Sequence, residues 1–370
     1  MAPVPRDGFR WPIEDRDSSG MLFGGFWPER HIGRGEYRGL EFLHVNARTI
    51  INSVPAASRM PFRYTINVYR GCSHACTYCF ARPTHEFLGL GIGEDFERRI
   101  VVKVNAVERA RAELSSSRWQ GDLIAMGTNT DPYQHAEGKY HLTHGVVGVL
   151  SERQNPFSIL TKSTLVLRDL ALLAEAAQGT SVRVNVSIGT LDRDVWRLTE
   201  PGTPPPDKRL EVVRRLNDAG VACGVLVAPV LPGLSDADEQ VIAVVEACRD
   251  AGAVGVSAIG LHLRPGVREH YLSWLASVRP DLVELYTTRF QRGSYQPRRQ
   301  QERLSALVSQ VLGGGPAGDR PVRSSPRSAP VEAAASAMGG TGAMGGTGAM
   351  SAAHAPDASP GGQLALFSPE

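Results

Sequence analysis

What this 370-residue sequence lacks already excludes several classes of protein. No stretch reaches the roughly 18 successive apolar residues that a membrane-spanning helix needs. Residues 1–27 carry Asp, Glu and Pro without an apolar run, so we expect no secretory signal peptide. The 40 basic residues nearly balance the 38 acidic ones, and a net charge of +2 does not by itself indicate nucleic-acid binding. We expect a globular, cytoplasmic protein.

Cysteine is scarce and unevenly placed. The sequence has five: Cys72, Cys76, Cys79, Cys223 and Cys248. The first three fall within eight residues of one another, and the other two stand apart. A disulfide framework has an even number of cysteines spread through a small secreted chain. The distribution therefore predicts a reducing compartment and a local cysteine site.

The composition divides the chain into segments. Residues after 312 are rich in Gly, Ala, Ser and Pro, and the unit Ala-Met-Gly-Gly-Thr-Gly occurs twice in succession there. Such a segment buries too little apolar surface to offset the entropy of ordering it. We expect an irregular N-terminal segment, a core barrel, a helical C-terminal extension and a disordered tail, at residues 1–60, 61–265, 266–312 and 313–370.

Short β-branched runs alternate with helical patterns through the core. The expected strands are 64–69, 123–126, 157–161, 182–188, 221–227 and 255–259, and the expected helices are 105–114, 142–153, 165–177, 207–219 and 236–251. Thr143 and Thr164 lie near expected helix starts, and Gly220 and Gly252 follow expected helix ends. This order predicts an α/β fold of parallel strands, a partial (β/α)6 barrel. Its active site should lie at the C-terminal ends of the strands.

The cysteine cluster follows the first expected strand with the spacing Cys-x3-Cys-x2-Cys. Cys72, Cys76 and Cys79 can ligate three irons of a cubane that normally takes four cysteines, leaving one iron open. Gly71 lets the chain turn sharply before them. The alternative is a zinc site with His74 or His85 as fourth ligand, although zinc sites more often show paired Cys-x2-Cys units.

This motif, with an aromatic residue before its last cysteine, resembles the signature of the radical S-adenosylmethionine (SAM) superfamily. The resemblance implies a [4Fe-4S] cluster whose open iron binds SAM, and an external electron donor. Reductive cleavage of SAM would give a 5′-deoxyadenosyl radical that removes a hydrogen atom from the substrate. It also implies an adenine contact from the loop around Cys79, at Tyr78 and Phe80, and Tyr78 is our candidate for hydrogen transfer.

Other residues resemble the branch of that superfamily related to spore photoproduct lyase, a DNA repair enzyme. The resemblance covers roughly residues 63–265 and is most specific in the cysteine loop and in Asp-Pro-Tyr-Gln at 131–134. It extends to Glu200-Pro201 and to four positions near strand ends: Thr130, Lys162, Ser187 and Ala228. It implies that these four contact SAM, with the Ala228 backbone near its adenine. Asp131 would bond a polar SAM group or orient Lys162.

One position departs from the branch. Spore photoproduct lyase has a cysteine that returns a hydrogen atom to the product radical, and the matching position here is Thr128. A threonine O–H is a far poorer hydrogen-atom donor than a thiol. Cys223 lies at the start of the fifth expected strand, the opposite end from the site. The hydrogen-return step should therefore differ.

Two C-terminal features suggest partners. Arginines at 289, 292, 298, 299 and 303 lie near Phe290 and Tyr295, a composition that suits either phosphates and bases or a solvated helix face. The tail ends in a peptide that resembles the sliding-clamp motif of bacterial DNA polymerases and repair proteins: Gln363, Leu364, Ala365, Leu366 and Phe367. Three of its side chains would fill an apolar pocket, with Gln363 at the rim.

Three functional hypotheses follow. The first is a radical SAM enzyme, of lyase or transferase class, that acts on DNA and is tethered to the clamp. The second is a radical SAM enzyme that modifies RNA, a protein or a small molecule. The third is a zinc-bearing binding module without catalysis.

Overall fold

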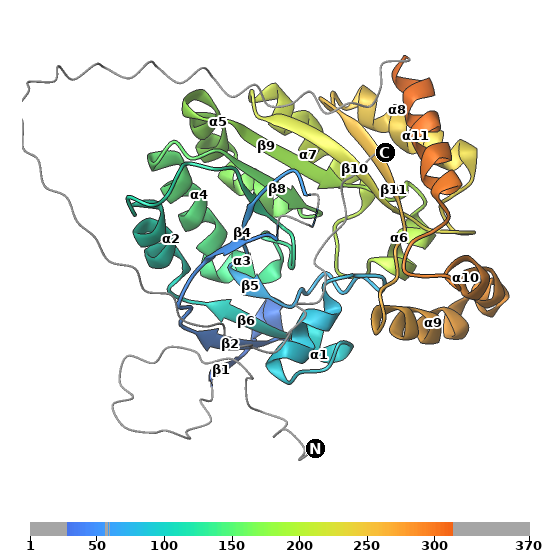
Figure 1. Cartoon of the computed structure of the whole chain (residues 1–370), viewed down its shortest axis with the longest axis horizontal. Coiled ribbons are helices and arrows are strands. Elements are labelled where there is room, and N and C mark those ends of the chain that lie inside the picture. Colours follow the sequence, from blue (N-terminus) through green and yellow to red (C-terminus); the bar gives the residue numbers. More distant parts are fainter. Residues whose placement is uncertain (1–27, 56–57, 59, 314–370) are drawn as a thin grey trace, which may run out of the picture.

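The computed structural model describes residues 28–55, 58 and 60–313, and its main element is a seven-stranded sheet. The strand order is β11-β10-β9-β8-β7-β4-β3 (Figure 1). Six strands are parallel and follow the chain in order: β4 (Tyr64–Ile66), β7 (Ile124–Met126), β8 (Phe157–Thr161), β9 (Val182–Ser187), β10 (Ala222–Val230) and β11 (Val256–Gly260). β3 (Ile51–Ser53) pairs antiparallel with β4 at the edge. The predicted partial (β/α)6 barrel is confirmed.

Helices connect the parallel strands of the larger sheet (Figure 1). They are α2 (Ala106–Leu114), α3 (His135–Tyr140), α4 (Leu142–Glu152), α5 (Leu170–Gly179), α6 (Arg193–Thr199), α7 (Pro206–Asp218) and α8 (Asp238–Asp250). On α8 the buried residues Val241, Val244, Val245 and Cys248 recur with helical spacing. They pack against β10 and β11, and in β11 the alternate residues Val256 and Ala258 are buried. One continuous core therefore holds the strand ends at fixed positions.

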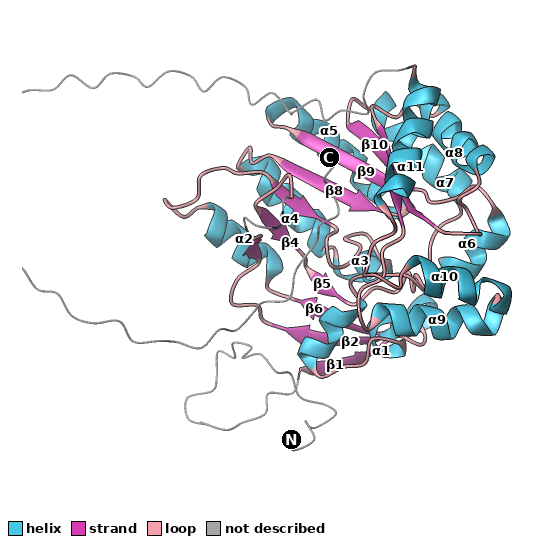
Figure 2. Ribbon diagram, turned by 45° about the vertical axis from the view of Figure 1, so that its right-hand side comes forward, coloured by secondary structure: helices cyan, strands magenta, loops and turns pink. Residues whose placement is uncertain are grey.

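A second sheet of four strands was not predicted. Its order is β1-β2-β6-β5, from β1 (Glu29–Ile32), β2 (Glu41–Val45), β6 (Arg99–Lys103) and β5 (Tyr69–Arg70). Figures 1 and 2 show it below the larger sheet, beside the short helix α1 (Glu94–Arg98). The 3-10 turn η1 (Gly35–Tyr37) connects β1 to β2. The expectation of an irregular segment over residues 1–60 is wrong for the described part, because β2 finds its parallel partner β6 some 58 residues later.

Two local expectations were also wrong. The expected strand 64–69 is divided between the two sheets, because the Asn67 side chain bonds the loop after β7 instead of continuing a ladder: its Oδ1 accepts from Asn129 N at 3.1 Å. The expected helix 165–177 begins as a 3-10 turn, η4 (Thr164–Asp169), that Ser163 caps rather than Thr164. Thr143 does not cap α4, since its hydroxyl donates to Pro132 O. Gly220 and Gly252 do follow helix ends, each with φ +80°.

The C-terminal extension is helical, as expected. It comprises α9 (Val267–Val278), η5 (Pro280–Leu282), α10 (Val283–Arg289) and α11 (Arg298–Leu312). α11 packs on α8 and β11, and α9 packs beside α10 (Figure 2). Within the described part of the chain, no helix has the length and apolarity to cross a membrane. The residues expected to form the tail lie outside the described residues beyond Gly313, and so do Gln363, Leu364, Leu366 and Phe367.

The basic C-terminal segment is largely neutralised by acidic partners. Arg289 lies 2.9 Å from Asp236, Arg298 pairs with Glu302 at 3.0 Å, and Arg303 pairs with Asp238. Phe290 is buried in the small core around α9 and α10. These pairs favour the solvated-face interpretation over phosphate binding for most of the segment.

Candidate active site

The cysteine loop begins where β5 ends, at a glycine that no other residue could replace without strain. Gly71 has φ +79°, and a Cβ there would lie 2.8 Å from both a ring carbon of His85 and the Phe96 carbonyl. The Cys72 amide donates to that same carbonyl at 2.9 Å. The turn therefore delivers the three cysteines from the small sheet to the C-terminal ends of the barrel strands.

The three thiols of the loop lie in a low-dielectric environment. Cys72 and Cys76 are each 7% exposed, and Cys79 is partly buried. Burial raises the pKa of all three thiols, that of Cys76 to about 12. The nearby Asp131 and the other two thiols raise the pKa of Cys72 further. Three thiolates are stable together here only with cationic compensation, which iron ions supply. The donor set therefore fits a metal cluster.

Both histidines that could serve as a fourth zinc ligand beside the three cysteines already have partners. His74 Nδ1 lies 3.3 Å from Asp131, and His85 Nε2 bonds Arg99 O.

A buried arginine that sequence reasoning missed donates hydrogen bonds to the backbone of the cysteine loop. Arg82 is 0% exposed, and its guanidinium donates to Cys76 O at 2.8 and 3.1 Å and to Ile92 O at 2.9 Å. Its charge is balanced by Glu97 at 2.5 Å. It also lowers the pKa of the Cys79 thiol, although burial dominates. In the sequence, the feature that could have pointed to Arg82 was its position three residues after Cys79.

The Asp-Pro-Tyr-Gln segment also braces the cysteine loop. Gln134, fully buried, donates to Gly71 O at 2.8 Å and accepts from Ser73 N at 3.0 Å. The predicted SAM contact Thr130 donates to Gly71 O at 2.6 Å and accepts from Gln134 Nε2 at 2.8 Å. The Thr130 hydroxyl therefore already donates its proton to the loop carbonyl of Gly71, and it can only accept a hydrogen bond from a ligand.

Asp131 links the ends of two neighbouring strands. Its carboxylate accepts from Lys162 N at 2.8 Å and from Thr161 Oγ1 at 2.7 Å, both at the end of β8. Burial raises the pKa of Asp131, but His74 and these hydrogen bonds outweigh it, and the net pKa is lowered. Asp131 thus orients Lys162 through its backbone amide and not through its ammonium.

The predicted SAM contacts on β8, β9 and β10 converge. Lys162 Nζ lies 2.6 Å from Ser187 Oγ and 3.4 Å from Ala228 O, and Ser187 Oγ donates to Ala228 O at 2.8 Å. Lys162 Nζ also lies 3.1 Å from Glu200 Oε1. Three residues separated by 25 and 41 positions in the sequence therefore form one polar corner, with an ammonium at its centre.

A buried carboxylate joins this corner to the cysteine loop. Glu200 accepts hydrogen bonds from Tyr78 OH and from the guanidinium of Arg209. Burial raises the pKa of Glu200, but Arg209 and Lys162 outweigh it and lower the pKa to about 2. The pKa of Tyr78 is raised well above its usual value, by burial and then by Glu200, so Tyr78 stays a phenol. Glu200 had been noted only for its resemblance to the photoproduct-lyase branch, and Arg209 on α7 was missed.

The other side of the site is aromatic. The Phe80 ring lies 6.3 Å from that of His262, which follows β11, and His262 stacks on Tyr295 at 4.9 Å. Burial lowers the pKa of His262 to about 4, and the charge of Arg264 lowers it further. The imidazole is therefore neutral at pH 7, and Phe80 faces an uncharged ring.

No thiol lies at the end of β7. Thr128 Oγ1 accepts from Asn67 Nδ2 at 3.0 Å at that position. Cys223, at the start of β10, and Cys248, on α8, are both fully buried in the main core. All five cysteines of the chain are described, so beyond the loop no cysteine reaches this end of the barrel.

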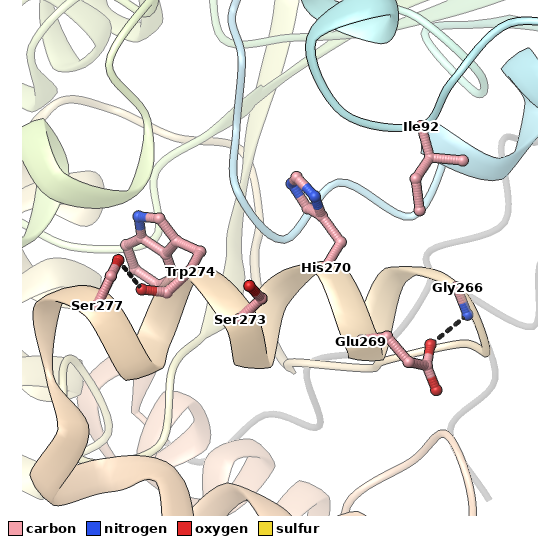
Figure 3. Close-up of a pocket in the computed structure, with 7 residues that line it drawn as sticks. All are labelled: Ile92, Gly266, Glu269, His270, Ser273, Trp274 and Ser277. Atoms are coloured by element: carbon pink, nitrogen blue, oxygen red, sulfur yellow. Dashed lines mark hydrogen bonds between the residues drawn. The ribbon is translucent and has the colours of Figure 1, made fainter.

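A surface pocket of about 810 Å³ lies outside this site, against α9 (Figure 3). His270 and Trp274 point into it from α9, and Ile92 faces them from the segment before α1. None of the residues that line it is a predicted site residue.

Comparison with known proteins agrees with this arrangement. The model of the radical SAM superfamily matches residues 66–245. An uncharacterized protein of Mycobacterium tuberculosis is 44% identical over 301 residues, which cover 81% of this chain and 88% of that protein. One from Acidianus two-tailed virus is 31% identical over 254 residues, 66% of this chain and 83% of the viral protein.

Solved structures of spore photoproduct lyase share the fold. The enzyme complexed with dinucleoside spore photoproduct superposes with a TM-score of 0.54 at 19% identity, over 74% of this chain and 80% of that chain. A variant with bound SAM and the same photoproduct gives a TM-score of 0.53 at 20% identity with the same coverage.

Proposed function

The chain belongs to the radical SAM superfamily, whose enzymes use a [4Fe-4S] cluster and SAM, and from this premise we propose that it acts on DNA. We assign the cluster to Cys72, Cys76 and Cys79. When bound and reduced, the cluster supplies the electron that cleaves SAM and releases a 5′-deoxyadenosyl radical. The observation that carries the assignment is the set of three thiols in one loop, two of them buried and one partly buried, beside the C-terminal ends of parallel strands.

SAM is held by the polar corner between β8 and β10. The Lys162 ammonium, which lies beside Ser187 Oγ and Ala228 O, would pair with the SAM carboxylate, while Ser187 and the Ala228 backbone would contact the nucleoside part. Before SAM binds, Glu200 holds Lys162 Nζ in position from 3.1 Å. Because Arg209 keeps Glu200 ionised, this arrangement persists across the physiological pH range.

Hydrogen transfer in this enzyme involves Tyr78. The phenol lies in the cysteine loop, is 7% exposed, and its proton is directed to Glu200. With Thr128 where the photoproduct-lyase branch has a cysteine, hydrogen return from a thiol at that position is absent. The reaction therefore differs from that of spore photoproduct lyase at this step.

Two observations support DNA as the substrate. The fold is shared with an enzyme whose structure contains a dinucleoside photoproduct. The C-terminal sequence Gln-Leu-Ala-Leu-Phe resembles a sliding-clamp peptide, and clamp binding would raise the local concentration of the enzyme on DNA. We propose that Gln363, Leu364, Leu366 and Phe367 make this contact.

The first test measures SAM cleavage. Protein purified without oxygen should contain about four irons and release 5′-deoxyadenosine on reduction. Cys76→Ala should abolish both, because it removes one of three cluster ligands. Cys248→Ala is the matched control, since that thiol lies in the main core on α8. A Cys76→Ala protein that forms 5′-deoxyadenosine at the wild-type rate would refute the cluster assignment.

The second test separates substrate classes. Wild-type enzyme is incubated with ultraviolet-damaged DNA, undamaged DNA, RNA or protein extract, and SAM-derived products are followed by mass spectrometry. Substrate-dependent turnover with damaged DNA alone is the expected result. Turnover that requires RNA or protein would leave the cluster assignment intact and overturn the choice of DNA.

A further inference from the structure

The outer hairpin of the small sheet gathers potential metal ligands on one face. Glu29 and His31 are two residues apart on β1 and therefore point to the same side. Glu29 lies directly opposite His44 of β2 in the antiparallel register. Side chains directly opposite one another lie about 5 Å apart at Cβ. The hairpin geometry alone therefore places a carboxylate and two imidazoles together.

The ligand atoms of these three side chains are closely spaced. One carboxylate oxygen and one ring nitrogen from each histidine all lie within 4.8 Å of one another. The two imidazole rings are stacked, with centroids 3.9 Å apart and an interplanar angle of 29°. No other set of this kind occurs in the described part of the chain.

One atom of the cluster lacks a normal partner. His31 Nε2 is shielded from solvent and makes no hydrogen bond, although Glu29 Oε1 lies 2.9 Å away. A carboxylate oxygen and a ring nitrogen at this distance share either a proton or a cation. Both atoms are therefore directed at one position, which a metal ion can occupy in place of the proton.

A hydrogen-bonded neighbour orients the second histidine. His44 Nε2 lies 2.7 Å from Tyr140 OH at the end of α3. Lys139 lies over the rings of Phe42 and Tyr140, at 5.0 and 5.1 Å. Neutral imidazoles with a hydrogen-bonded neighbour are the usual state of histidine metal ligands.

We propose that Glu29, His31 and His44 bind a divalent transition-metal ion, separate from the iron–sulfur site. Two nitrogens and one oxygen suit zinc, cobalt or nickel, and zinc commonly takes three such protein ligands with water in the fourth position. The ion joins β1 to β2, and Tyr140 connects it to α3. β2, β6 and β5 are successive neighbours in the small sheet, and β5 continues into the cysteine loop. The ion therefore stabilises the outer edge of the sheet that carries this loop.

The test measures zinc and iron together. Cluster-loaded protein is dialysed without oxygen against micromolar zinc, and both metals are counted by mass spectrometry. Wild type should bind one zinc per chain and keep its four irons. His31→Ala and His44→Ala should lose the zinc and keep the irons, and Tyr140→Phe should bind it about 10-fold more weakly.

The matched control is His270→Asn, which removes a histidine from α9 and should bind zinc like the wild type. Wild-type protein that binds no zinc above background would overturn the proposal. Equal zinc uptake by wild type and His44→Ala would also overturn it. If that uptake occurs with loss of iron, the zinc occupies the cysteines.

Discussion

Lys162 is the residue at which the most contacts of the candidate site meet. Its backbone amide bonds Asp131, and its ammonium lies beside Ser187, Ala228 O and Glu200. The ring of Tyr78 lies 5.8 Å from the same ammonium. Several elements thus contact one ammonium group. Its side chain is only 14% exposed, and the low dielectric of this environment strengthens each electrostatic contact.

Replacing this cation should weaken SAM binding without removing the cluster. A charge-assisted hydrogen bond contributes about 1.5–3 kcal/mol, so Lys162→Ala should lower SAM affinity about 10- to 100-fold. Lys208→Ala, on the first turn of α7, should have no effect. The change in the cluster's electron paramagnetic resonance signal on SAM addition measures the affinity. Unaltered affinity in Lys162→Ala would contradict the assigned SAM site.

The buried lysine at the end of β6 predicts a pH dependence of stability. Lys103, at the end of β6, is 8% exposed and donates to Asn67 O at 2.7 Å. Burial, and then the charge of Arg70, lower its pKa to about 7 from 10.5. Between pH 7 and 10.5 the unfolded chain holds more protons at this position than the folded protein, so stability rises with pH in that window.

Comparison with Lys103→Met isolates this effect. The wild type should gain about 1.4 kcal/mol of unfolding free energy per pH unit relative to the variant, as the pH rises from 7 toward 10. Urea unfolding of cluster-loaded protein at pH 7, 8 and 9.5 measures the difference. A difference that stays constant across the three pH values would show that Lys103 remains charged in the fold.

At the scale of elements, the cysteine loop is shaped by what lies behind it. Arg82 of η3 (Arg82–Leu88) holds the Cys76 carbonyl, and Gln134 and Thr130 hold Gly71 O. Buried donors and acceptors that lose their partners are costly, so these contacts restrict the loop to one conformation. The loop needs this support because it is neither helix nor strand.

Two glycines with the same backbone conformation should respond differently to alanine. Gly71 (φ +79°) and Gly220 (φ +80°) both lie in the left-handed region, but a Cβ at Gly220 meets nothing within 4 Å, whereas one at Gly71 meets His85 and Phe96 O. Gly220→Ala should cost about 1 kcal/mol and keep four irons. Gly71→Ala should lose most of its iron. Iron content and urea unfolding distinguish them, and full iron loading in Gly71→Ala would contradict the strained turn.

At the scale of the whole molecule, the barrel, the small sheet and the C-terminal helices serve one site. The small sheet delivers the cysteines, the barrel strands deliver the proposed SAM contacts, and the segment after β11 delivers His262 and Tyr295. The residues after 313 lie outside the described part and carry the proposed clamp contact.

The clamp contact should be separable from catalysis. Leu366→Ala/Phe367→Ala should abolish retention of the full-length protein on immobilised sliding clamp, because it removes two apolar anchors. SAM cleavage should remain at the wild-type rate. Ser368→Ala, next to the motif, is the control and should be retained normally. Equal retention of the double variant and the wild type would end the clamp proposal.

The sequence alone determined the barrel and the placement of three cysteines in one loop, because both depend on local patterns. Strand and helix periodicity, helix-ending glycines at 220 and 252, and three cysteines within eight residues are readable without tertiary information. Only the tertiary structure decided the rest. The small sheet depends on pairing across 58 residues. Arg82, Gln134 and Arg209 matter because burial leaves their polar groups dependent on particular partners, and neither burial nor partner is encoded by spacing along the chain.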